Sequence, residues 1–180
     1  GVDAVVHLAG ESIAGGRWTS ARKARILDSR VRSTRLIADA LSHLAKPPAV
    51  LVTASAVGYY GDRGDEILTE ESSPGTGFLS DVCRQWEEAT RAAATAHIRT
   101  CHIRLGVVLS ARGGALKQML LAFRLGLGGR LGPGRQWMSW IALEDVVGAV
   151  RHVLSHPEIE GPANVVAPNV VSNADFTRAL

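Results

Sequence analysis

The fold is decided by residues 50–61, which read VLVTASAVGYYG. The segment begins as an apolar run and ends in small residues, two tyrosines and a glycine. An apolar run of this length between two helical patterns is typical of a buried strand of a parallel sheet. Ligands of such sheets bind beyond the carboxyl ends of the strands. Ser55, Tyr59 and Tyr60 are therefore expected at that edge. Ser55 there either binds a ligand or caps a turn, and the tyrosines either bind or pack.

Strand and helix patterns alternate on both sides of this segment. Further strands are predicted over residues 3–8, 100–109 and 163–166, and helices over residues 19–44, 78–96 and 143–155, with another helix from Gly113–Gly114 and an N-cap at Asn173. The polar residues 62–77 between them predict a long loop. Alternation of this kind is the signature of parallel βαβ units. The predicted fold class is therefore α/β, a Rossmann-like, doubly wound and mainly parallel sheet.

Length, composition and cysteine spacing predict a globular, cytoplasmic protein of one domain. The chain has 180 residues, 46% of them hydrophobic, which is enough for one domain with a real core. Cys83 and Cys101 lie far apart without metal-binding spacing and predict reduced thiols in a cytoplasmic protein. No signal peptide is recognised, and the apolar stretch 115–127 contains charged residues, so no membrane span is predicted.

Two groups of side chains suggest, in turn, a metal site and an anionic partner, and neither is predicted. His152 and His156 are spaced like a zinc-binding pair but lack a third ligand, so no metal site is predicted. Residues 17–35 contain seven basic residues against one acid. Such a run indicates either an anionic partner or a solvated helix face, and the second reading is favoured, so nucleic acid is not an expected partner.

Six motifs in order resemble one family. They are HLAGESI (7–13), TASAVGYYG (53–61), WEEA (86–89), RLGVVLS (104–110), GGRLGPGRQWMSWI (128–141) and LEDVVGAV (143–150). Together they resemble the atypical branch of the extended short-chain dehydrogenase/reductases, the nucleoside-diphosphate-sugar epimerase-like family.

The resemblance implies a domain plan. It places the start of this chain at the family's fourth strand, so a fragment is expected that lacks the N-terminal glycine-rich half and the C-terminal extension. Residues 1–112 are then the C-terminal part of an NAD(P)-binding Rossmann-like domain, 113–162 belong to a substrate-side lobe, and 163–180 are a returning strand and the start of a helix. The sheet edge and helix faces left open favour association, so a homo-oligomer is an expected state.

The resemblance also assigns a cofactor, NADP or NAD, and a small-molecule substrate. Ser55 matches the serine that binds the reacting oxygen in active relatives. The cofactor-binding positions implied are Leu8, Ala9, Gly10, Ala54, Ser55, Arg104, Leu105, Gly106 and Val107. The implied substrate-side positions are Gln136, Trp137, Ser139 and Trp140.

One departure from the family pattern bears on activity. Active relatives carry Tyr-x-x-x-Lys before a helix glutamate, and alignment on Glu87 puts Leu79 and Cys83 at those positions. Neither side chain can act as the phenol–cation pair that accepts a proton as hydride leaves.

Tyr59, Tyr60 or Glu11 are the candidate substitutes for the absent pair. Two functions therefore stay open. One is an oxidoreductase or epimerase acting on a nucleotide-sugar or another small hydroxyl or carbonyl compound. The other is a non-catalytic NADP-binding sensor or partner-binding protein.

Overall fold

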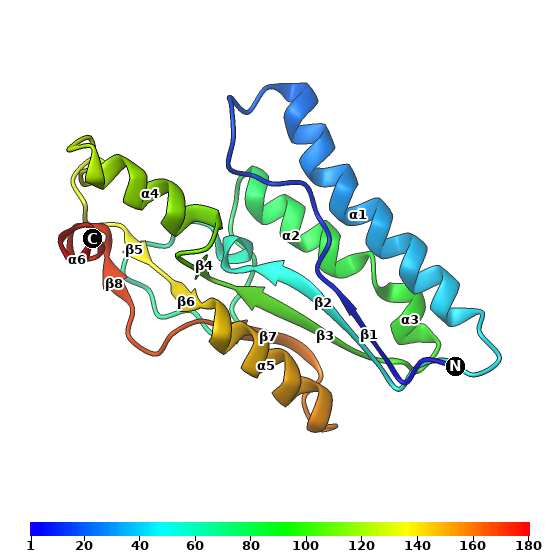
Figure 1. The fold of residues 1–180 in the computed structure, drawn as a ribbon. Helices are drawn as coiled ribbons and strands as arrows, with labels where there is room; N and C mark the ends of the chain where they lie inside the picture. Colours follow the sequence, from blue (N-terminus) through cyan, green and yellow to red (C-terminus); the bar gives the residue numbers. More distant parts are fainter.

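A computed structural model describes residues 1–180 and has a four-stranded parallel sheet at its centre. The strand order is β1 (Ala4–His7), β2 (Val50–Ala56), β3 (Arg99–Leu105) and β7 (Gly161–Val165). All three neighbouring pairs are parallel. The predicted parallel arrangement of these segments is confirmed, and β2 and β3 run side by side in Figure 1.

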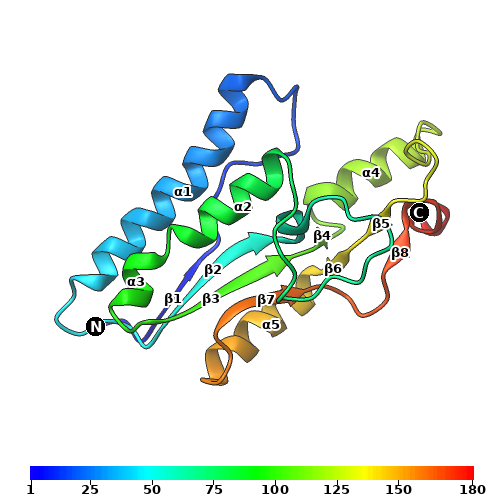
Figure 2. The same ribbon diagram turned by 180° about the vertical axis from the view of Figure 1, so that it is seen from behind.

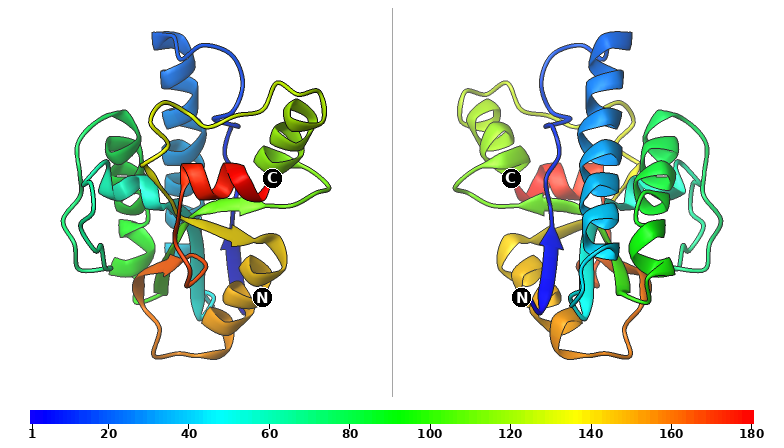
Figure 3. Two further views of the ribbon diagram at one scale, coloured as in Figure 1. Left: turned by 90° about the vertical axis from the view of Figure 1, so that its left-hand side faces the viewer. Right: turned by 90° about the vertical axis from the view of Figure 1, so that its right-hand side faces the viewer.

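Helices cover both faces of this sheet. One face carries α1 (Ser20–Ser42), α2 (Phe78–Glu88) and α3 (Arg91–Thr95), and the other carries α5 (Leu143–Ser155). Figure 2 shows this arrangement from behind, and Figure 3 shows the sheet between the two layers. Because side chains alternate along a strand, Leu51 packs with α1 and α3, whereas Val50 and Val52 pack with α5.

The sequence explains the limits of the longest helix. Thr19 caps α1, since its hydroxyl accepts a hydrogen bond from the backbone N–H of Arg22. The helix ends before Pro47 and Pro48, as expected for residues that disfavour helix. The buried positions Ile26, Ala38 and Leu41 lie on the face that meets the sheet and its neighbours.

Three predicted boundaries were wrong. The strand expected over 100–109 breaks at Gly106, and β4 (Val107–Leu109) pairs instead with β6 (Trp140–Ala142). A Cβ at Gly106 would lie 2.7 Å from the Ser139 carbonyl oxygen, so the change of direction needs a glycine. The helix expected over 78–96 divides into α2 and α3 at Ala89–Thr90, and Ser172, not Asn173, is the N-cap of α6.

The remaining elements gather beyond the carboxyl ends of the central strands. They are the short helix η1 (Val57–Tyr60), α4 (Gly114–Arg124), β5 (Trp137–Met138), β8 (Val171–Ser172) and α6 (Asn173–Ala179). α5 falls within the segment predicted as a substrate-side lobe but packs against the central sheet. None of the helices has both the length and the apolar character needed to cross a membrane.

Candidate functional site

Strand register brings three polar residues together at the carboxyl end of the sheet. Ser55 on β2 pairs with Arg104 on β3, which pairs with Asn164 on β7. All three are on the face that α2 covers. Ser55 and Arg104 are 2% and 3% exposed, so their polar atoms need protein partners.

Glu87 on α2 is the partner they share. The Ser55 hydroxyl donates to Glu87 Oε1 at 2.6 Å. The guanidinium of Arg104 donates to both carboxylate oxygens, from Nε and Nη2, at 2.9 Å each. This is the two-point geometry that makes arginine–carboxylate pairs strong and directional. Burial opposes the charge on Arg104, but its bonds to Glu87 and Tyr60 outweigh that effect and raise the pKa of the guanidinium.

The network extends through Tyr60 to the loop at 62–77. The Tyr60 hydroxyl accepts from Arg104 Nη1 at 2.9 Å and donates to Asn164 Oδ1 at 2.7 Å. Glu70 accepts from the Asn164 backbone N–H at 2.7 Å, and its carbonyl accepts from Arg104 at 3.2 Å. The loop is therefore tied to two central strands.

Tyr59 lies beside the network. Its ring stacks on the Arg104 guanidinium, with Cζ 3.5 Å from the ring centroid, a cation–π contact. The Tyr59 carbonyl accepts from the Ser80 hydroxyl and from the Gly75 N–H. The contact with Arg104 fixes the ring at the edge of the sheet, and no protein atom hydrogen-bonds its hydroxyl.

Leu79 and Cys83 lie on the side of α2 that faces η1. A Cβ added at Gly58 of η1 would be 3.5 Å from Leu79 Cβ and 3.9 Å from Cys83 Sγ. Cys83 is buried, and burial together with the Glu87 carboxylate raises the pKa of its thiol to about 11. The thiol is therefore protonated at neutral pH and is a poor proton acceptor.

The segment after β1 runs along α1, away from the Ser55 network. Leu8, Ala9 and Gly10 are exposed, and the Glu11 carboxylate is 3.5 Å from Arg25 Nε. Glu11 forms its hydrogen bonds and ion pair with Ser29, Arg30 and Arg25, and none with Ser55, Tyr59 or Tyr60. The structure thus separates Glu11 from the other three residues predicted as catalytic.

A groove of 1310 Å³ opens beyond the carboxyl ends of three central strands. Val57 and Tyr60 follow β2, Val107 follows β3 and Val166 follows β7, and all line it. Gln136, Trp137 and Ser139 line it as well, so three of the four predicted substrate-side residues line the same groove as Tyr60.

The other predicted positions lie elsewhere. The Trp140 indole donates to the Asn169 carbonyl at 3.1 Å and is not in the groove wall. Ala54 is buried, and Leu105 packs against the core under α5. Gly106 is where the chain turns from β3 to β4.

Sequence reasoning missed Glu87, Asn164 and Glu70 as members of the network. Glu87 entered only as an alignment point, and it is 32 residues from Ser55 along the chain. One signal was available, because an arginine inside an apolar strand needs a buried acceptor.

A parallel sheet with helices on both faces and a groove at its carboxyl edge defines a Rossmann-like α/β protein. Residues 1–167 match the model of the NAD dependent epimerase/dehydratase family. An epimerase family protein of Mycobacterium bovis is 47% identical over 99% of this chain. The chain belongs to that epimerase/dehydratase family, as its motifs indicated.

Solved structures agree with this placement. The human epimerase family protein SDR39U1, solved with NADPH, is 37% identical, with a TM-score of 0.92 over 98% of this chain and 60% of that one. A nucleoside-diphosphate sugar epimerase from Corynebacterium glutamicum is 44% identical, with a TM-score of 0.85 over 98% of this chain and 37% of that one. The chain spans 59% of the length of its Mycobacterium bovis relative.

Proposed function

We propose that this chain forms the nicotinamide-side half of an NAD(P)-binding oxidoreductase or epimerase of the extended short-chain dehydrogenase type. The observation that carries the proposal is the groove, whose lining includes Val57, Val107 and Val166, which lie just beyond the ends of β2, β3 and β7. Ligands of open α/β sheets bind at this edge. The human relative was solved with NADPH, which favours NADP over NAD as the cofactor.

The substrate in this proposal is a nucleotide-sugar or another small hydroxyl or carbonyl compound. Gln136, Trp137 and Ser139 line the groove and would contact it. Val107, which lines the groove, and the exposed Leu8–Gly10 would contact the cofactor. The cofactor supplies hydride transfer, and the residues of this chain orient the reacting carbon and exclude water. A cytoplasmic location and a homo-oligomeric state stay predictions.

A specific observation favours a second function, that of a non-catalytic NADP-binding sensor or partner-binding protein. The positions of the usual tyrosine and lysine hold Leu79 and Cys83, and the Ser55 proton is donated to Glu87. Of the candidate substitutes, Tyr60 is bonded at its hydroxyl by Arg104 and Asn164, whereas Tyr59 has a free hydroxyl.

The test uses the full-length protein with NADPH and NADH, followed by a panel of nucleotide-sugars and small ketones. NADPH binding in the micromolar range with measurable turnover is the expected result for the enzyme. Binding without turnover on any member of the panel supports the sensor. Failure to bind either dinucleotide would overturn both functions.

A further inference from the structure

The segment that follows β1 is fastened to α1 by side chains of the helix. The Glu11 backbone N–H donates to Ser29 Oγ at 3.0 Å, and the Glu11 carbonyl accepts from Arg30 Nη1 at 3.0 Å. Both backbone polar groups of one loop residue are thus held by two consecutive helix residues. A loop residue held at both groups loses most of its freedom to move.

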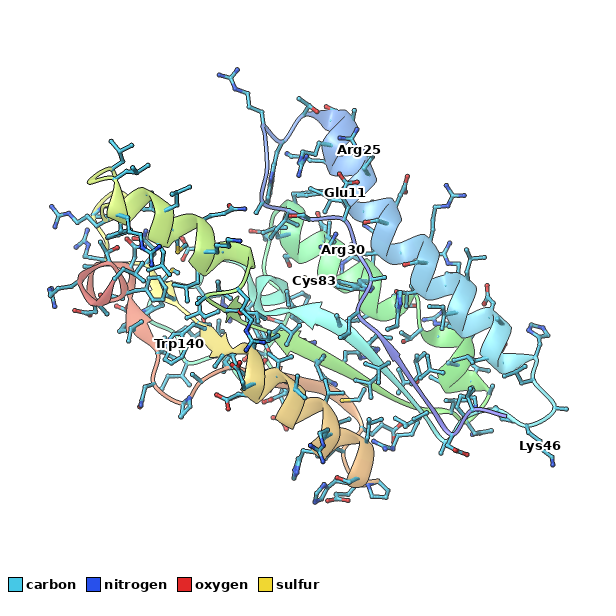
Figure 4. All side chains as sticks on the ribbon, in the orientation of Figure 1. Glu11, Arg25, Arg30, Lys46, Cys83 and Trp140 are labelled. Carbon is cyan, nitrogen blue, oxygen red and sulfur yellow. The ribbon has the colours of Figure 1, made fainter.

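Other residues of the basic run strengthen this attachment. Arg22 donates to the Ser12 carbonyl at 2.9 Å, and Arg25 lies 3.5 Å from the Glu11 carboxylate. Figure 4 shows Arg25 and Arg30 along α1 beside Glu11. The run is therefore more than a solvated helix face, because part of it organises the loop at the carboxyl end of β1.

Arg30 has the most contacts of these arginines. Its Nη1 also donates to the Ile26 carbonyl at 3.1 Å, and its Cζ lies 5.1 Å from the centroid of the Trp86 ring. A Cβ on Gly10 would be only 3.2 Å from Arg30 Cζ, so the loop backbone rests on the guanidinium. Arg30 Nε and Nη2 donate to no protein atom, which leaves donors for a ligand.

Arg30 also supplies positive charge next to α2. Its charge acts on the thiol of Cys83, against the larger effects of burial and Glu87, and Figure 4 shows the two side chains as neighbours. Cys83 stands at the helix position where the family pattern has lysine. The cation that this helix lacks is thus provided from the neighbouring helix.

We propose that Arg30 is a positioning residue of the dinucleotide site. It fixes Gly10 and Glu11 at the carboxyl edge of β1, and its remaining N–H groups donate to oxygen atoms of the bound cofactor. The inference rests on the proposed function, since it needs a dinucleotide at this edge. Arginine suits the task because its planar guanidinium donates in several directions while its stem packs on an aromatic ring.

The test compares Arg30→Met and Arg30→Lys in the full-length protein. Methionine keeps the packing on Trp86 but removes the charge and every donor. Loss of a charge-assisted bond should raise the Kd for NADPH about tenfold or more. In the absence of cofactor, amide hydrogen exchange at residues 9–13 of Arg30→Met should be about tenfold faster than in the wild type. Lysine restores the charge but not the planar set of donors, so its Kd should lie between those of the methionine variant and the wild type.

Arg32→Met is the matched control, because Arg32 lies on the same helix, is exposed and forms no hydrogen bond or ion pair with the loop that follows β1. It should leave both Kd and exchange unchanged. Wild-type Kd in Arg30→Met, or a lysine variant that binds no better than the methionine variant, would overturn the proposal. If the wild type binds no dinucleotide, the proposed function and this inference both fail. If the wild type binds and Arg30→Met matches it, only the inference fails.

Discussion

Ser55 on β2 and Glu87 on α2 are joined by a hydrogen bond of 2.6 Å, in which the serine hydroxyl donates. The same carboxylate accepts hydrogen bonds from Nε and Nη2 of Arg104 on β3. The serine proton is therefore committed to an internal acceptor, while the serine oxygen keeps its lone pairs. Glu87 thus links two strands and a helix at the end of the sheet where the groove opens.

The ion pair between Glu87 and Arg104 should dominate the stability of this edge. We predict that Glu87→Gln destabilises the protein by about 3 kcal/mol, because it leaves a buried arginine without its counter-charge. The side chains are 12% and 3% exposed, so water cannot replace the carboxylate. Urea unfolding of the two proteins measures the loss.

Glu88→Gln is the control for that change. Glu88 pairs with Arg91 one turn away, and both side chains are more than half exposed. Exposed pairs of this kind contribute little, so a change of about 0.5 kcal/mol or less is expected. Equal losses in the two variants would contradict the assigned role of Glu87.

Replacement of Ser55 separates a structural from a catalytic role. Ser55→Ala removes one donor from Glu87, which keeps its two bonds from Arg104, so about 1 kcal/mol of stability should be lost. If the hydroxyl also binds the reacting oxygen, turnover per folded molecule should fall about a hundredfold with little change in cofactor affinity. An unchanged turnover beside a lowered melting midpoint would leave Ser55 as a structural residue and favour the non-catalytic binder.

We predict that the buried thiol of Cys83 makes the protein less stable at high pH. Its pKa is about 11 in the folded protein against an ordinary value of 9.0. Between these values the unfolded chain has lost the proton that the folded chain retains, so stability falls as pH rises from about 9 to 11. The loss should approach about 3 kcal/mol, at about 1.4 kcal/mol for each pKa unit.

Urea unfolding at pH 8 and pH 10.5 checks this pH dependence. Cys83→Ala should flatten the decline, whereas Cys101→Ala should leave most of it, since only Cys83 combines burial with a neighbouring carboxylate. The same decline in Cys83→Ala as in wild type would assign the effect to other groups.

Gly75 is predicted to be intolerant of any side chain. A Cβ there would lie 2.0 Å from the Tyr60 carbonyl oxygen, which is rigid backbone, so the loop at 62–77 would have to move. We expect Gly75→Ala to lower stability by about 2 kcal/mol or more. Gly148→Ala is the matched control. Gly148 lies within α5 with open space around it, and alanine should add about 1 kcal/mol there. A stable Gly75→Ala variant would contradict the close contact.

The central sheet could be predicted because its strands carry local signals. The apolar residues 50–52 and the helical patterns beside them depend on neighbours a few positions away. The break at Gly106 could not be predicted in the same way, because residues 105–109 read as one uninterrupted apolar run. The turn is required by the Ser139 backbone, which is distant in the sequence.

The candidate site likewise contains positions that local sequence predicts and contacts that it does not. Ser55 and Tyr60 were predicted at the carboxyl edge because they follow a buried strand, and the structure places them there. Arg104 was assigned to cofactor binding, yet its guanidinium is directed at Glu87 and Tyr60. The partner of a buried charge is set by tertiary packing, and no local pattern specifies it.

The proposed function requires a dinucleotide to bind at the carboxyl edge of the parallel sheet. Amide hydrogen exchange of the full-length protein, with and without saturating NADPH, tests it most directly. We expect slower exchange at residues 8–11, 55–60 and 105–107 when NADPH is bound, and unchanged exchange at the opposite ends of the same strands. Protection confined to other surfaces, or no protection at a concentration well above that of the protein, would contradict the proposed function.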